Sequence, residues 1–533
     1  MATLGEFFEA TCTRFGHREM LAEARGSTVE LRLSGNALLE ATRGLAHRLL
    51  EQGVRRGMHV GLLCPNRIDW VTHAFALWQL GAVLVPLSTL WKANELHHAL
   101  RHADVERLFA VPRFLKHDYR AILQEFVPEI TNESYATDLF LPRLPTLRAV
   151  HFLGEEPRAP ASGRKSRVDD MLQALRKVGS EADRAAIFFT SGTTAVPKAV
   201  VHCHAALVLS AERIAAALGI DESDCWWGHM PLFWTGGFVL GLLASWAGGA
   251  RVMLHERFEP GEALELLERE RCTIMAGWHQ AGPLLAHPDF SRRNLALRKG
   301  SAHPLADQLL SKPHGAVGMY GLSETATCVA CARWDEPEAL RLQTAGRPLP
   351  GTEVRIVDPA TGQAVPPDTP GEICVRGPTL MEGYYKVARQ EVFDSSGFFH
   401  TGDLGFLDKD GRLHFTGRLK DVIKTAGVNV AAQEVEEVLA QHEAVQSAHV
   451  VGVPHPVRGE NIAAFVVPRP GRMLGPAELL AHCRERMASY KIPRHIFVIQ
   501  AEELPRTATG KVEKSALRAE AQRRLSGEPQ AKP

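Results

Sequence analysis

The stretch that decides the interpretation of this chain is IFFTSGTTAVPK, residues 187–198. An apolar, strand-like run leads into a loop with four hydroxyl side chains, one glycine and one lysine: Thr190, Ser191, Thr193, Thr194, Gly192 and Lys198. N–H and O–H groups in such a loop can donate to phosphate oxygens, and a lysine neutralises their charge. The Walker A pattern is absent. The segment therefore predicts a phosphate-binding loop, and a plain Ser/Thr-rich turn is the alternative for this segment taken alone.

The rest of the chain has the composition of a large globular protein. Its 533 residues exceed one ordinary domain, so we expect two or more hydrophobic cores. Hydrophobic residues make up 45% and charged residues 23%, as in ordinary folded proteins. Lys plus Arg and Asp plus Glu are equal at 61 each, so the charge balance gives no reason to propose nucleic acid or an anionic membrane as the main partner.

Cysteine usage and the apolar stretches indicate the compartment. Nine scattered cysteines do not form a disulfide framework, and we expect the one CxxC pair, Cys328 and Cys331, to be buried core rather than half of a zinc site. The first residues lack a basic segment followed by an apolar run, so they are not a signal peptide. The longest apolar stretch, residues 238–254, is too short and too interrupted to span a membrane. We expect a cytoplasmic protein without a transmembrane segment.

Helix and strand patterns alternate through the first part of the chain. Apolar residues at helical spacing over residues 34–52 end at Gly53, and a short buried strand follows. The same alternation predicts helices at 69–80 and 263–271 and strands at 59–64, 82–85, 251–254 and 273–276. Such alternation is typical of stacked α/β units with mostly parallel sheets.

The pattern of residues along the sequence changes near residue 346. Strands are expected at 354–357 and 371–376, and a hairpin at 405–415 turns around Asp410-Gly411. A compact α+β stretch then runs from residue 418 to about residue 517, and we expect the tail from residue 526 to be disordered. The predicted fold is α/β: a large N-terminal domain (1–417) of stacked mixed α/β sheets with a β-rich subdomain (346–417), and a small α+β C-terminal domain (418–533).

The phosphate loop resembles TSGTTGxPKG, the signature of the adenylate-forming superfamily of acyl-CoA synthetases, adenylation domains and luciferases. Ala195 and Ala199 replace two usual glycines, a change that we expect to stiffen the loop without removing its hydroxyls or its lysine. Further on, YGLSE at residues 320–324 resembles the family's YGxTE motif, with a serine in place of the threonine. The resemblance implies that Tyr320, Gly321 and Ser323 bind the nucleotide and that Glu324 ligates Mg²⁺.

Three later motifs follow in the family's order. FHTGD at 399–403 and GRLKDVIK at 417–424 resemble the family's TGD and hinge motifs. They imply that Asp403 and Arg418 hold the ribose and that the mobile C-terminal domain swings at Lys420. Gly427 matches the glycine past which a thiol reaches the acyl group.

The last motif, LPRTATGK at 504–511, resembles the late family motif PRTxxGK. It implies that Lys511 bridges the substrate carboxylate and the α-phosphate. With Glu324, Thr193 and Lys198 it completes the expected catalytic set.

The resemblance implies activation of a carboxylic acid by ATP with Mg²⁺, followed by transfer to a thiol. Attack on the α-phosphorus gives acyl-AMP and pyrophosphate, and Lys511 and the loop donors would stabilise the developing negative charge. Coenzyme A is the expected acceptor, because no carrier domain is attached. A carrier-protein thiol, a luciferase-like oxidation and a non-catalytic nucleotide-binding protein are the alternatives, and the sequence leaves a homodimer open.

The acid is expected to be apolar. In MPLFWTGGF, residues 230–238, Trp234 stands where many acyl-CoA synthetases carry a histidine, and Gly236 and Gly237 would make room for an acyl chain; core packing is the alternative for the tryptophan. Medium- or long-chain fatty acids and alicyclic or aromatic acids are the candidates. Gly300 begins GSAHP in place of the family's adenine-side GGAP-like loop, and the segment from there to Tyr320 is shorter than usual.

Overall fold

A computed structural model describes most of the chain: residues 2–130, 135–154, 165–190, 197–277, 280–303, 305–311, 314–425, 428–456, 458–487, 491–507 and 510–527. The chain folds into two compact units. The first unit comprises Met1–Glu353 with Val375–Phe399, and the second comprises Val354–Cys374 with His400–Pro533.

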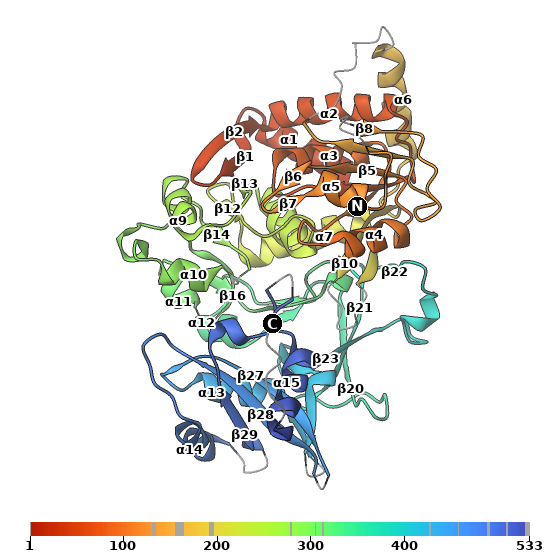
Figure 1. Ribbon diagram of the computed structural model, residues 1–533. Coiled ribbons are helices and arrows are strands. Elements are labelled where there is room, and N and C mark those ends of the chain that lie inside the picture. The colour runs from red at the N-terminus through yellow and green to blue at the C-terminus, as the bar shows by residue number, and fades with distance from the viewer. Residues whose placement is uncertain are drawn as a thin grey trace. The chain divides into compact units, whose positions relative to one another are not determined.

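A seven-stranded sheet forms one half of the first unit (Figure 1). Its order is β16 (Gly315–Val317), β15 (Lys299–Ser301), β14 (Ile274–Met275), β12 (Cys225–Gly228), β13 (Arg251–His255), β1 (Glu19–Arg25) and β2 (Thr28–Ser34). All neighbours are parallel except β1 and β2. Alternate side chains enter two separate cores, with Trp226 on one face and Trp227 on the other. Both faces are therefore covered, as expected for parallel strands.

An eight-stranded sheet forms the other half of this unit. Its order is β22 (Gly383–Tyr384), β11 (Lys198–Cys203), β10 (Arg184–Thr190), β4 (Val83–Pro86), β3 (His59–Leu63), β5 (Arg107–Ala110), β9 (Ala149–Phe152) and β8 (Tyr135–Ala136). The strands from β10 to β9 are parallel to one another, whereas β11 and β22 continue the sheet in antiparallel pairs. The shared core of the two sheets contains the helix α3 (Ile68–Gln79), nearly all of which is buried.

Helices cover the sheets of the first unit. They are α1 (Leu4–Phe15), α2 (Gly35–Glu51), α4 (Ala93–His102), α5 (Tyr119–Gln124), α6 (Lys165–Val178), α7 (His204–Leu218), α8 (Ala244–Gly248), α9 (Pro260–Arg269), α10 (Ala281–Ala286), α11 (Ala306–Leu309) and α12 (Glu338–Gln343). α2 begins where the Ser34 side chain accepts a hydrogen bond from the Ala37 N–H. A small sheet of β17 (Met319–Tyr320), β18 (Ala330–Cys331) and β19 (Arg347–Pro348) follows the seven-stranded sheet in sequence.

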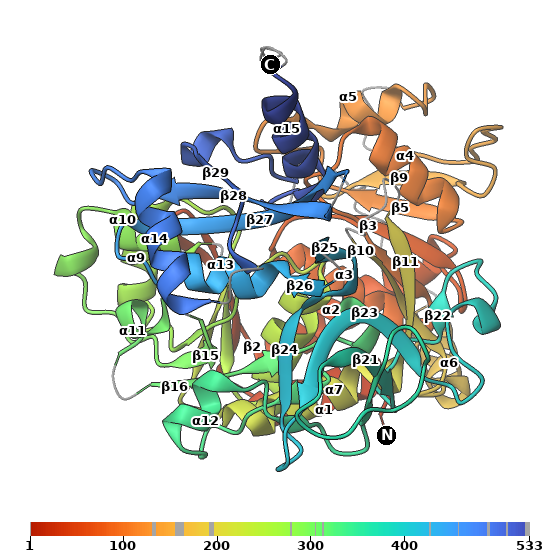
Figure 2. The ribbon, with the colours of Figure 1, turned by 90° about the horizontal axis from the view of Figure 1, so that it is seen from below.

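The second unit is built on two sheets. β20 (Glu353–Val357), β21 (Gly371–Arg376), β23 (Phe399–Leu407) and β24 (Leu413–Arg418) form the first in that order. The second has the order β26 (Val428–Ala431), β25 (Val422–Thr425), β28 (Gly459–Pro468) and β27 (Val445–His455), and β29 (His495–Val498) pairs with β28. Figure 2 shows the helices of this unit around β27 and β28. α13 (Ala432–Ala440) and α14 (Pro476–Arg486) share a core with one face, and α15 (Lys514–Ser526) shares a core with the other.

The structure confirms the α/β architecture expected from the sequence. The helix expected at 34–52 is α2, the helix at 69–80 is α3, and the hairpin at 405–415 is β23 and β24. The expected end of the α+β stretch near residue 517 is wrong, since α15 runs to Ser526 and buries Leu517 and Ala521 one turn apart. Residues 528–533 of the expected tail lie outside the described residues.

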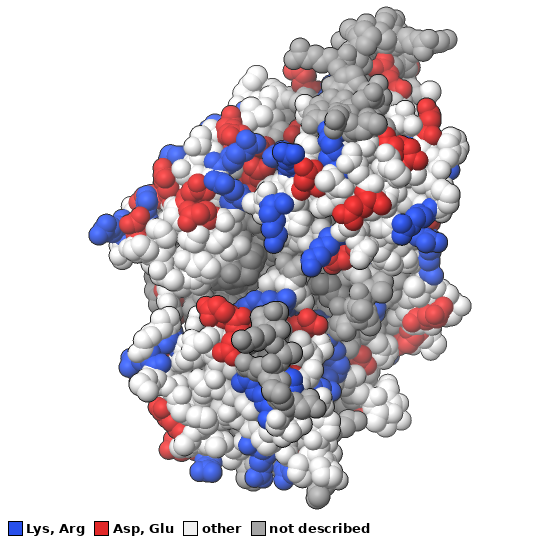
Figure 3. All heavy atoms as spheres, in the orientation of Figure 1, with Lys and Arg blue, Asp and Glu red and all other residues white. Residues whose placement is uncertain are grey.

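The structure also bears on the expectations for the cysteines and for a membrane span. Cys328 and Cys331 are buried, unbridged members of the core of the first unit. Among the described residues, no helix is both long and apolar enough to cross a membrane. On the face drawn in Figure 3, basic and acidic side chains are interspersed, in keeping with their equal numbers.

Candidate active site

The predicted phosphate loop connects two antiparallel strands of the eight-stranded sheet. β10 ends at Thr190 and β11 begins at Lys198, and these two residues lie directly opposite each other. Four of the predicted loop residues, Ser191, Gly192, Thr193 and Thr194, lie outside the described residues, as does Ala195. Ala199 is buried, and its carbonyl accepts the Tyr385 N–H at 2.8 Å. The strand pairing therefore holds both ends of the loop together.

Lys198 and Glu324 are connected through Tyr384, which the sequence did not single out. The Tyr384 hydroxyl donates to Glu324 Oε1 at 2.8 Å, and Lys198 Nζ lies 4.6 Å from the centre of the Tyr384 ring. β22 carries this tyrosine beside β11, where Tyr384 is paired with Val200. Burial, followed by the nearby Glu324 carboxylate, raises the pKa of Tyr384 far above its usual value. The phenol is therefore a protonated donor at neutral pH.

The YGLSE segment is held by backbone constraints around a short 3-10 helix. Tyr320 is buried in β17, and a Cβ on Gly321 would lie 1.9 Å from the Thr327 carbonyl oxygen, so only glycine fits there. Ser323 and Glu324 belong to the helix Ser323–Thr325. Glu324 is only 9% exposed, which places its carboxylate in a partly desolvated position.

A buried histidine of β11 also holds the YGLSE segment in place. His202 in β11 is fully buried, and its Nε2 lies 2.7 Å from the Ser323 carbonyl oxygen. Burial lowers the pKa of His202 to about 4, so the ring is neutral at pH 7. Because a carbonyl oxygen only accepts, Nε2 carries the proton and donates. Sequence reasoning missed His202 because nothing local distinguishes it from a core residue of β11.

The segment that contains Trp234 contacts Ser323 through the neighbouring residue Thr235. The Thr235 hydroxyl donates to Ser323 Oγ at 3.3 Å, while Trp234 is half-buried with its ring edge-on to Phe233. A π-helix, Gly236–Leu243, follows directly, and such helices are frequent at functional sites. A Cβ on Gly237 would lie 2.1 Å from the Pro231 carbonyl oxygen, so close backbone packing by itself requires this glycine.

Gly236 and Gly300 lie at two further close approaches. A Cβ on Gly236 would meet the end of the Met230 side chain at 2.7 Å, a contact that a flexible methionine can relieve. Gly300 in β15 has φ +156°, and a Cβ there would lie 2.0 Å from the Met275 carbonyl oxygen of β14. Gly300 also neighbours Ala316 of β16, near the carboxyl ends of parallel strands where α/β folds bind ligands.

The remaining predicted residues belong to the second unit. Asp403 of β23 and Arg418 of β24 lie opposite each other, and Arg418 Nε is 3.0 Å from Asp403 Oδ1. The Asp403 residue is 2% exposed, so Arg418 pairs with a carboxylate that is largely removed from water. Lys420 follows in the 3-10 helix Leu419–Asp421, and Gly427 lies outside the described residues.

Lys511 shares a region of positive charge with Arg418 and Lys420. Desolvation first, and then the charges of Arg418 and Lys420, lower the pKa of Lys511 below the usual lysine value. Desolvation is also the largest cause that lowers the pKa of Lys420, followed among the unfavourable charges by Arg418 and Lys514. Three cations that oppose one another's charge, offset only in part by the carboxylates of Asp403 and Asp421, suit a site for an anion.

The predicted residues thus fall into two sets. The first unit connects Lys198, Glu324 and the Trp234 segment, and the second connects Asp403, Arg418 and the two lysines.

Comparison with known proteins gives matches over nearly the whole chain. The model of the AMP-binding enzyme family matches residues 8–385, and the model of the AMP-binding enzyme C-terminal domain matches residues 434–511. The medium-chain fatty-acid–CoA ligase of Escherichia coli is 30% identical, over 98% of this chain and 91% of that protein. A methyl-dioxo-octahydroindenyl-propanoyl:CoA ligase of Mycobacterium tuberculosis is 32% identical, over 94% of this chain and 95% of that protein. The anthranilate CoA ligase AuaEII, solved with anthranoyl-AMP, superposes with a TM-score of 0.81 at 26% identity over 98% of each chain.

Proposed function

Because this chain belongs to the AMP-binding enzyme family, and its relatives over nearly its full length are acid–CoA ligases, we propose that it activates an apolar carboxylic acid with ATP and transfers the acyl group to coenzyme A. The observation that carries the proposal is the contact of Tyr384 with both Lys198 and Glu324. It brings together two motifs, the phosphate loop and YGLSE, that are far apart in the sequence.

In the first step the acid's carboxylate attacks the α-phosphorus of ATP, giving acyl-AMP and pyrophosphate. We assign the loop residues Thr190, Ser191, Gly192, Thr193 and Thr194, together with Lys198, to the phosphates. Lys511 contacts the reacting carboxylate and α-phosphate. Desolvation lowers the pKa of Lys511, and an anion bound beside it would act in the opposite direction, because opposite charge favours the protonated form.

Glu324 fits the role of a magnesium ligand. Tyr384 donates to Oε1, which fixes the carboxylate and leaves it the second oxygen for a hard cation. Mg²⁺ bound there would offset the negative charge on the phosphates.

We assign the nucleotide's adenosine to the following residues. Asp403 would accept hydrogen bonds from the ribose hydroxyls, with Arg418 holding the carboxylate in place. Tyr320, Gly321, Ser323 and Gly300 would border the adenine and the phosphates. In the second step the C-terminal domain (418–533) turns at Lys420 relative to residues 1–417, and the thiol of coenzyme A passes Gly427.

The apolar acid is proposed from Trp234, Gly236 and Gly237 and from the relatives. Trp234 is half-buried beside a π-helix, so a large apolar ring borders this segment. The two curated relatives are named for a medium-chain fatty acid and for a propanoate on a fused ring system. Both are carboxylic acids with a largely hydrocarbon body, which carries two keto groups in the second, and neither has an α-ammonium group. Cytoplasmic location belongs to the same proposal.

The test is exchange of labelled pyrophosphate into ATP with a panel of carboxylic acids. We expect exchange that depends on an apolar acid, and CoA thioester formation when CoA is added. Lys511→Ala should abolish the exchange, whereas thioester formation from supplied acyl-AMP should partly survive, because Lys511 serves only the first step. If no acid in a broad panel supports exchange, or if only a phosphopantetheinylated carrier releases AMP, the proposal is wrong.

A further inference from the structure

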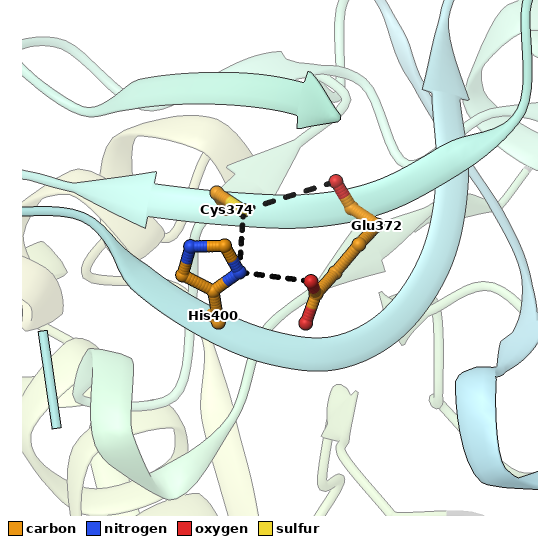
Figure 4. Close-up of side chains that lie close together, drawn as sticks. All are labelled: Glu372, Cys374 and His400. Carbon is orange, nitrogen blue, oxygen red and sulfur yellow. Dashed lines mark hydrogen bonds and ion pairs between the residues drawn. The ribbon is translucent and has the colours of Figure 1, made fainter. Parts of the chain in front are cut away.

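Three side chains with different metal-binding atoms converge on one face of the β20–β24 sheet. Glu372 and Cys374 stand two residues apart on β21, so they share a face of that strand. His400 stands on the neighbouring strand β23 and points at both (Figure 4). None of the three was expected to take part in the site described above.

The ligand atoms of these residues are close together. His400 Nδ1 lies 2.8 Å from Glu372 Oε2 and 3.4 Å from Cys374 Sγ, and all three atoms lie within 4.8 Å of one another. Among the residues that the structure describes, this is the one group of three such side chains with this spacing. Carboxylate, thiolate and imidazole are the three ligand types of protein zinc sites.

We propose that Glu372, Cys374 and His400 form a binding site for a zinc-class divalent cation. Zinc–ligand bonds of about 2.0–2.3 Å in a tetrahedron separate neighbouring ligand atoms by about 3.3–3.7 Å. The Nδ1–Sγ separation of 3.4 Å already falls within this range, and the Nδ1–Oε2 separation of 2.8 Å needs to open by about half an ångström. Side-chain rotation in two strands that stay paired can provide that shift.

Charge and proton balance also suit a divalent cation. Glu372 supplies one negative charge and Cys374 supplies a second when its thiol loses its proton to solvent. His400 stays neutral, but its proton moves from Nδ1, where it faces the Glu372 carboxylate, to Nε2, because Nδ1 becomes the ligand. The bound site is therefore neutral overall, and binding releases the thiol proton. A thiolate also favours zinc or cobalt over Mg²⁺ and Ca²⁺, which prefer oxygen.

Neighbouring groups hold the ligands in place. The Gly402 N–H donates to the other carboxylate oxygen, Glu372 Oε1, at 3.0 Å. The Thr401 hydroxyl donates to the Ile373 carbonyl at 2.7 Å, which keeps β21 and β23 in register around the three side chains. Such outer hydrogen bonds orient ligands in metal sites. Cys374 is buried, but the His400 side chain is 42% exposed, so an ion and a fourth ligand from water can enter on that side.

The experiment titrates the full-length, metal-free protein with Co²⁺ in the presence of a non-thiol reductant. Binding is monitored by the thiolate-to-cobalt charge-transfer absorption and by the d–d absorption bands of tetrahedral Co²⁺. We expect one Co²⁺ per chain, displacement by one Zn²⁺, and release of one proton. Cys374→Ser should abolish the charge-transfer band, and Glu372→Gln and His400→Gln should weaken binding by at least about tenfold. His400 is half-exposed, so its variant tests the site even if Cys374→Ser does not fold.

The matched control is Cys203→Ser, which removes a partly buried cysteine of β11 in the other unit. It should keep the band and the affinity. Absence of the band in the unaltered protein, or its loss in Cys203→Ser but not in Cys374→Ser, would overturn the proposal. The three side chains would then be a hydrogen-bonded contact between two strands and nothing more.

Discussion

Replacing Tyr384 with phenylalanine isolates one hydrogen bond of the proposed site. The variant removes the hydroxyl that donates to Glu324 Oε1 at 2.8 Å and keeps the ring over which Lys198 lies. The Glu324 residue is only 9% exposed, so little water is available to replace the lost donor. Its carboxylate would then be less firmly oriented for the proposed role of metal ligand.

The size of the effect follows from the charge of the acceptor. A hydrogen bond to a charged group contributes about 1.5–3 kcal/mol, and each 1.4 kcal/mol corresponds to about a tenfold change in rate. We therefore expect kcat/KM for acid-dependent pyrophosphate exchange to fall by about 10- to 150-fold. Because the change affects the carboxylate that we assign to Mg²⁺, higher Mg²⁺ should recover part of the loss.

The neighbouring tyrosine provides the control. The Tyr385 hydroxyl donates to Asp104 at 2.9 Å, away from Glu324, and Tyr385→Phe removes the same number of atoms. That variant should exchange pyrophosphate at nearly the rate of the unaltered protein. If Tyr384→Phe stays within twofold of the unaltered enzyme at every Mg²⁺ concentration, the assigned role of Tyr384 is wrong.

Two further predictions concern the same motif. His202 is neutral because burial lowers its pKa to about 4, below the 6.5 of an unfolded histidine, so its contribution to stability is complete above pH 6.5 and is lost as pH falls from 6.5 toward 4. Urea unfolding of His202→Gln should therefore show a stability that falls less steeply over this window, by about one proton or 1.4 kcal/mol per pH unit, and an unchanged slope would contradict the assignment. Gly321→Ala should lower the midpoint of thermal unfolding and acid-dependent exchange together, since the new Cβ would lie 1.9 Å from a backbone oxygen. Gly282→Ala, at a helical position of α10 where a new Cβ would meet nothing within 4 Å, is the control for both readouts, and it should retain the exchange activity that Gly321→Ala loses.

Local patterns in the sequence were enough to predict much of the fold. The helix α2 could be predicted because its leucines recur at helical spacing between Ser34 and Gly53, and the buried residues of the helix include Leu38, Leu45 and Leu49. The β23–β24 hairpin could be predicted from Asp410-Gly411, a local turn signal. Both depend on residues close together in the chain.

Contacts made through strand pairing could not be predicted in this way. Tyr384 meets Glu324 from 60 residues further along the chain, and it does so because β22 pairs with β11. No periodicity encodes that pairing. The cluster of Glu372, Cys374 and His400 has the same origin, since two of its members show the alternation of one strand and the third comes from its neighbour. Gly237 was expected to make room for an acyl chain, but its close approach to Pro231 is a reason that only coordinates reveal.

The pairing of Thr190 with Lys198 in the β10–β11 ladder limits how this part of the chain can change over evolution. The register of β11 against β10 has little freedom, because a slip of β11 by one residue would turn every side chain to the opposite face of the sheet. Lys198 would then leave the Tyr384 ring, and His202 would leave Ser323. Natural variants should therefore show hardly any insertions or deletions within positions 198–203.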